Sequence, residues 1–101
     1  MTLDDLLHAV EALAADETEP GVILACLRTL GHDPDDTVLA DAVELVRARD
    51  GLLDGSSDPY RYLECEPRAG VNVRDAALAR CEDDLRWCLE ALARPRRVVA
   101  S

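Results

Sequence analysis

The sequence contains no phenylalanine and no lysine, and its aromatic residues are one tryptophan and two tyrosines. The core of a chain of 101 residues must then be built from leucine, valine and alanine, which suits packed helices better than a β-sandwich. The longest apolar run, residues 22–27, is too short to span a membrane. No basic and apolar leader follows Met1, so we expect a cytoplasmic protein that does not contact a membrane.

Positive charge is also scarce, since 21 acidic residues face 11 basic ones and the net charge is −10. A surface of this sign repels phosphate backbones and disfavours tight, sequence-independent binding of nucleic acid. It favours solubility, a cationic partner or life at high salt. The arginine-rich, lysine-free composition is typical of a high-GC bacterium or phage, or of a salt-loving archaeon.

The length predicts a single domain over residues 1–95, followed by a flexible tail at 96–101. Thr2 is placed to cap a first helix, Pro20 to open a second, and Asn72 to cap a fourth that ends near Arg94. A third helix is expected to open at residues 33–34 and to close at 50–51. The turn-rich stretch 54–59 and the alternating residues after it predict a small β-hairpin over residues 52–65.

Three helices, a hairpin and a long last helix follow one another in the order of a winged helix-turn-helix domain. Residues 3–65 resemble bacterial and archaeal regulators of this type, through the segments Leu27–Gly31, Thr37–Leu39, Arg47–Leu53 and Gly55–Tyr62. The resemblance implies a mainly α fold with a three-helix winged-helix-like core, and a last helix that serves for dimerisation. In the alternative in which such a domain binds DNA, the contacts would lie at Thr37, Tyr60, Arg61 and Tyr62.

The third helix departs from that family, because its outward positions are acidic where recognition helices carry residues that meet bases and phosphates. We therefore expect these carboxylates to bind a basic protein surface rather than DNA. The predicted partner-binding residues are Asp33, Asp35, Asp36, Asp41 and Glu44.

The fourth helix, expected over residues 73–94, carries apolar side chains at alternating steps of three and four. This heptad-like stripe predicts a homodimer, with a seam made of Leu78, Cys81, Leu85, Cys88 and Leu92. The four cysteines include no closely spaced pair of the kind that binds zinc. Two interpretations of them stay open: buried core residues, or thiols that respond to redox conditions or metals.

The sequence shows no pattern of catalytic residues and none that binds a cofactor or a metal, so we expect a protein without enzymatic activity. The hypothesis that fits best is a small, acidic, regulatory protein-interaction domain of winged-helix type. One alternative is a DNA-binding winged-helix regulator, halophilic or thiol-responsive. Another is an acidic inhibitor that mimics nucleic acid and binds a basic nucleic-acid-binding protein.

Overall fold

The computed structural model describes residues 2–63 and 68–95. This part of the chain contains four α-helices and one short 3₁₀-helix. They are α1 (Leu3–Ala14), α2 (Pro20–Thr29), α3 (Asp36–Asp54), η1 (Pro59–Tyr62) and α4 (Val73–Leu92).

The helix starts follow the local signals in the sequence. Thr2 and Asp5 form a reciprocal capping box at α1, with each side chain accepting a hydrogen bond from the other residue's backbone N–H. Pro20 stands in the first turn of α2. The side chain of Asn72 accepts from the backbone N–H groups of Arg74 and Asp75 at α4. These predicted starts are confirmed. The third helix begins slightly later than expected, with Asp35 as its cap.

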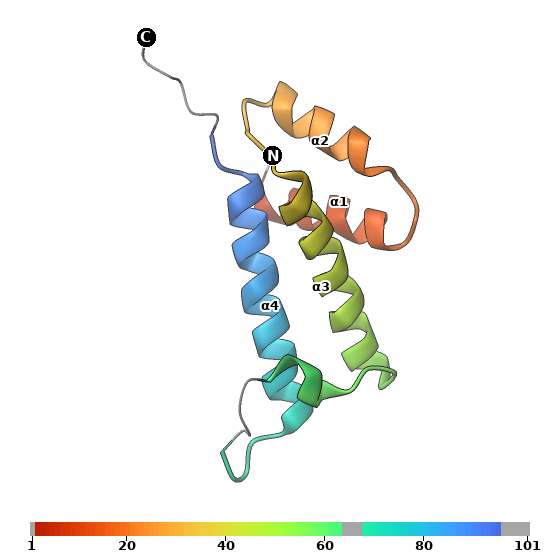
Figure 1. The fold of residues 1–101 in the computed structure, drawn as a ribbon, viewed down its shortest axis with the longest axis vertical. Helices are drawn as coiled ribbons and strands as arrows, with labels where there is room; N and C mark the ends of the chain where they lie inside the picture. Colours follow the sequence, from red (N-terminus) through yellow and green to blue (C-terminus); the bar gives the residue numbers. More distant parts are fainter. Residues whose placement is uncertain (1, 64–67, 96–101) are drawn as a thin grey trace.

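The long helices α3 and α4 lie side by side and run in opposite directions, while α1 and α2 lie across one end of this pair (Figure 1). The main core forms where α1 and α2 meet the pair. Its most deeply buried members are Leu6, Val10, Leu27, Leu39, Ala42, Val46 and Leu92. At the opposite end η1 packs against α4. The prediction of a mainly α fold is thus confirmed.

The predicted β-hairpin, and with it the winged-helix resemblance, is wrong. Helix α3 continues through Asp50 and Gly51 to Asp54 and ends at Gly55, whose φ of 83° suits a left-handed C-terminal glycine. Residues 59–62 form η1 instead of a strand, and the described residues include no strand, only an isolated bridge between His32 and Pro95. Because the wing is missing, the fold of the described residues gives no support to a DNA-binding regulator.

Gly51 explains why the third helix does not end at residues 50–51 as predicted. It lies in the interior of α3, where it is buried, and the turn after the helix folds back so that Ser57 N–H donates to the Gly51 carbonyl at 3.1 Å. A Cβ atom at this position would collide with the Ser57 side chain. The glycine is therefore needed for a close approach and does not stop the helix. The extra turn buries Leu52 against Ala77 and Cys81 in a second, smaller core.

The apolar stripe of α4 packs inside the single chain. Four of the five predicted seam residues, Cys81, Leu85, Cys88 and Leu92, are at most 4% exposed there, and Leu78 packs against the smaller core. The heptad-like spacing is thus accounted for by contacts within one chain, and a second copy could reach these side chains only by displacing its own neighbours. Homodimerisation stays a prediction that would need another surface or an exchange of helices.

The predicted tail at residues 96–101 and Cys65 both lie outside the described residues. Among the helices that the structure describes, none combines the length and the apolarity that a membrane span requires.

Candidate functional site: an acidic groove between α3 and α4

Four of the five predicted partner-binding carboxylates lie on one side of the α3–α4 pair. Asp33 and Asp35 precede and cap α3, and Asp41 and Glu44 follow about 1.7 and 2.5 turns beyond this cap. Asp36 instead faces α2, where its carboxylate lies 3.7 Å from the Arg28 guanidinium. The predicted acidic surface is thus brought together without Asp36.

Trp87, the single tryptophan of the chain, stands in the middle of this surface. It projects from α4, and 58% of its side chain is exposed. Hollows of about 370 and 310 Å³ lie on its two sides. The first is lined by Asp41, Glu44, Leu45, Asp84, Trp87 and Cys88, and the second by Asp33, Asp35, Val38, Trp87, Ala91, Arg94 and Pro95.

A third hollow of about 270 Å³ continues the depression towards η1. It shares Leu45 and Asp84 with the first, and adds Arg61, Tyr62, Leu63, Arg80 and Cys81. We call the three hollows together the Trp87 groove. From Arg80 to Pro95 it extends over about 20 Å at the rise of an α-helix, which matches about four turns of a bound helix or six extended residues.

Helix geometry explains why these residues share one groove. On α3, Val38, Asp41 and Leu45 recur at steps of three and four, as do Asp84, Trp87 and Ala91 on α4. Residues spaced in this way lie one above another on a helix face. The two faces meet along the seam between the antiparallel helices, with the smaller side chains forming the floor.

The end of the groove near Pro95 is fixed by backbone contacts. The Asp33 N–H donates to the Arg94 carbonyl at 3.2 Å, and the adjacent residues His32 and Pro95 form a β-bridge. Asp35 is held by its capping role, since its carboxylate accepts from the Thr37 N–H at 2.8 Å. These bonds hold the start of α3 against the end of α4.

The middle of the groove is strongly negative. Asp84 pairs with Arg80 at 3.4 Å and Glu44 with Arg47 at 3.4 Å, whereas Asp41 has no hydrogen bond or ion pair in the described part of the chain. Burial raises the pKa of the Cys88 thiol, and the charges of Asp41 and Asp84 raise it further. The floor beneath the indole therefore experiences the field of these carboxylates.

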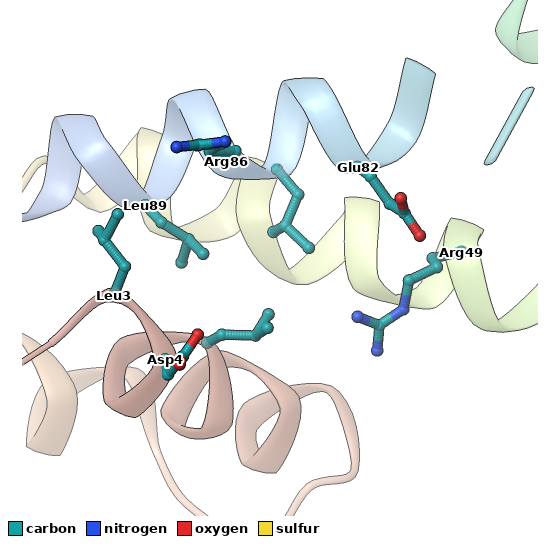
Figure 2. Close-up of a pocket in the computed structure, with 8 residues that line it drawn as sticks. Leu3, Asp4, Arg49, Glu82, Arg86 and Leu89 are labelled. Atoms are coloured by element: carbon teal, nitrogen blue, oxygen red, sulfur yellow. The ribbon is translucent and has the colours of Figure 1, made fainter. Parts of the chain in front are cut away.

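A separate pocket of about 400 Å³ lies between α1, α3 and α4 (Figure 2). Leu3, Leu7, Leu85 and Leu89 form its apolar lining, and Asp4, Arg49, Glu82 and Arg86 contribute two charges of each sign. The Arg49 guanidinium is already bound by Glu11 at 2.9 Å. The two acidic and two basic side chains of this pocket balance in charge, so it does not favour one class of ligand.

The groove contains neither a reactive thiol nor a histidine among its lining residues. Cys88 is 4% exposed and its raised pKa keeps it protonated near neutral pH, and none of the residues that line the three hollows is a histidine. In the described ranges, no three histidine, cysteine, aspartate or glutamate side chains are grouped closely enough to hold a metal ion. The arrangement is suited to binding a cationic, partly apolar surface.

The residues predicted for DNA contact do not form one surface. Thr37 lies in the first turn of α3, whereas Tyr60, Arg61 and Tyr62 belong to η1, beyond the other end of that helix. At the rise of an α-helix, the two ends of α3 are about 27 Å apart. This separation, and the absence of a wing among the described residues, removes the geometry on which those contacts were predicted.

Sequence reasoning did not identify Trp87. The apolar spacing of α4 predicts one seam, and the tryptophan lies beside that stripe, one position before Cys88. The sequence does carry a signal for Trp87. It is a lone aromatic residue beside the apolar stripe of a helix, on the same flank as an acidic residue, Asp84, three positions earlier.

Comparison with known protein families, with curated proteins and with solved structures finds no match.

Proposed function

We propose that this chain is a non-catalytic interaction domain whose Trp87 groove binds a basic segment of a partner protein. The observation that carries the proposal is the exposed indole of Trp87 between Asp41, Asp84 and the acidic start of α3. Exposed tryptophan is rare on surfaces that stay in water, and it is enriched at the centres of protein interfaces.

Charge selects the class of partner. The middle of the groove offers carboxylates from both helices, and the whole chain carries −10. The negative potential would therefore steer a basic segment towards the groove. The low exposure of the groove floor would strengthen the ion pairs that the segment forms there. The same potential repels nucleic acid, which supports a protein partner over a nucleic-acid one.

Binding to a labelled arginine- and lysine-rich peptide, measured by fluorescence anisotropy at low and at physiological salt, tests the proposal. The groove variant combines Asp41→Asn, Glu44→Gln and Asp84→Asn. The matched control combines Glu17→Gln, Glu19→Gln and Asp83→Asn, which removes as many charges from exposed positions outside the groove.

The groove variant should lose roughly tenfold in affinity, since each partly exposed ion pair contributes about 0.2–1 kcal/mol. The control should lose much less, and the affinity of the unmodified chain should fall as salt screens the charges. Equal losses in the two variants would show that net charge alone attracts the peptide, and would contradict a defined site.

A further inference from the structure

The hollow beside Trp87 has the features of a receptor for a single side chain. Its volume of about 370 Å³ exceeds that of an amino-acid side chain, and it is bounded by residues of two helices that pack firmly against each other. Leu45 and the buried Cys88 provide an apolar floor, while the indole of Trp87 forms one wall. Three carboxylates complete the lining, and none of the lining residues is basic.

We infer that this hollow receives one arginine side chain of the bound segment, with its guanidinium stacked on the indole of Trp87. This inference rests on the proposed function and adds the residue that the groove selects. The aliphatic part of the arginine covers Leu45 and the floor. The N–H groups of the guanidinium donate to the carboxylates of Asp41, Glu44 and Asp84.

The geometry of the cation decides between arginine and lysine. A guanidinium is planar and weakly hydrated, so it can lie flat on an indole and direct several N–H donors outwards in its own plane. In this hollow the carboxylates come from both α3 and α4, and a planar group with five donors can reach more than one of them. An ammonium group is compact and strongly hydrated, and it gains less from an aromatic wall.

Of the three carboxylates in the hollow, Asp41 should gain the most from an ion pair with a bound guanidinium. Glu44 and Asp84 already have arginine neighbours within the chain at 3.4 Å, whereas Asp41 has no ion pair or hydrogen bond among the described residues. An incoming guanidinium would therefore give Asp41 its first ion pair, without breaking one. We expect Asp41 and Trp87 to contribute more to arginine selection than Glu44.

The test uses a short alanine-based peptide that carries several arginines and no tyrosine or tryptophan, together with versions in which lysine or citrulline replaces each arginine. Because the chain contains one tryptophan, its fluorescence and its single indole N–H signal in a ¹H–¹⁵N spectrum both report on Trp87. The arginine peptide should shift both signals and bind roughly three- to tenfold more tightly than the lysine peptide. The citrulline peptide, which keeps the shape but lacks the charge, should not bind measurably.

Trp87→Ala should remove the preference for arginine over lysine and leave the weaker, charge-dependent binding in place. Trp87→Phe, which keeps an aromatic wall, should retain part of the preference. Asp41→Asn should weaken the arginine peptide more than Asp83→Asn, a matched change on the exposed surface of α4. Trp87 is mostly exposed, so these variants should remain folded, and circular dichroism checks this.

The outcomes distinguish a failure of the arginine receptor from a failure of the proposed basic-segment site. Equal binding of the arginine and lysine peptides, unaffected by Trp87→Ala, would overturn the arginine receptor while leaving a basic-segment site in place. Binding of neither peptide even at low salt would overturn the proposed function, and the arginine receptor with it.

Discussion

The guanidinium of Arg49 lies 2.9 Å from a carboxylate oxygen of Glu11, and this contact connects the second half of α3 to α1. The Arg49 side chain is only 18% exposed, and its second carboxylate neighbour, Asp50, lies at 3.4 Å. Although burial alone would lower the pKa of Arg49, its hydrogen bonds and its charged neighbours raise it overall. The pair is thus a partly buried, charge-assisted hydrogen bond between elements 38 residues apart in the sequence.

Replacing Arg49 by methionine should lower the free energy of unfolding by about 1–3 kcal/mol, because Glu11 would keep its charge in a partly buried position without a partner. The matched control is Arg47→Met. Arg47 is 48% exposed and pairs with Glu44 and Asp16 at 3.4 and 3.8 Å, so its loss should cost about 0.5 kcal/mol or less. Urea unfolding followed by circular dichroism measures both. Similar losses in the two variants would contradict the structural role of the Arg49–Glu11 contact.

A pair of glycine substitutions should change stability in opposite directions. Gly51→Ala introduces a Cβ that collides with Ser57, and should destabilise the fold by about 1–2 kcal/mol. Gly21→Ala, in open space on α2, should stabilise it by about 0.5–1 kcal/mol through helix propensity. Adding Ser57→Gly to Gly51→Ala should recover much of the loss. If Gly51→Ala alone were as stable as the unmodified chain, the close approach of the turn to α3 would be in doubt.

Gly51 also shows how far the fold could be predicted from the sequence. The starts of α1, α2 and α4 depend on Thr2, Pro20 and Asn72, whose effects are confined to one helical turn, and these were predicted correctly. The end of α3 depends on a contact between a glycine and a side chain beyond the helix. Local propensity favours a turn at Asp50–Gly51, but burial of Leu52 against α4 outweighs it.

Only part of the candidate site could be predicted from the sequence, because the rest depends on contacts between helices. Acidic residues at helical spacing on α3 are visible in the sequence, and their shared side follows from helix geometry. Which flank of α4 would face them depends on how the two helices are rotated against each other. That rotation is set by the buried stripe from Cys81 to Leu92, and it places Trp87 and Asp84 beside Asp41. The same packing buries the apolar stripe of α4 inside one chain, whereas the sequence predicts that this stripe binds a second copy.

Two surface carboxylates should titrate below the ordinary aspartate value of 3.8. The pKa of Asp5 is lowered by its hydrogen bonds from the backbone and side chain of Thr2, and that of Asp54 by those from Ser56. A lowered pKa in the folded state means that these bonds stabilise the fold above pH 3.8, and that their contribution is lost as the pH falls through the lower folded values. Carboxyl ¹³C shifts followed from neutral to acidic pH measure the two midpoints. Thr2→Val, which removes the hydroxyl but keeps the backbone N–H, should return the midpoint of Asp5 part of the way towards its ordinary value and leave that of Asp54 unchanged.

The thiols should differ sharply in reactivity. Cys26 is exposed on α2, whereas Cys81 and Cys88 are at most 4% exposed. Burial raises the pKa of both of these thiols, and nearby carboxylates raise it further, so little thiolate is available at neutral pH. In a Cys65→Ser background, which removes the cysteine outside the described residues, Ellman's reagent should modify one thiol rapidly. The other two should react slower by roughly tenfold or more, because they become accessible when α4 undocks.

The same difference predicts how oxidation would link two chains. If diamide produces a disulfide-linked dimer of the Cys65→Ser chain, Cys26→Ser should abolish it, while Cys88→Ser should leave it intact because that thiol is enclosed by its own chain. Non-reducing gel electrophoresis distinguishes the two variants. A dimer that instead requires Cys81 or Cys88 would mean that α4 leaves its place against α3 on a timescale of minutes. The apolar stripe would then be shared between two copies, and the packing of α4 against α3 of the same chain would be one of two states.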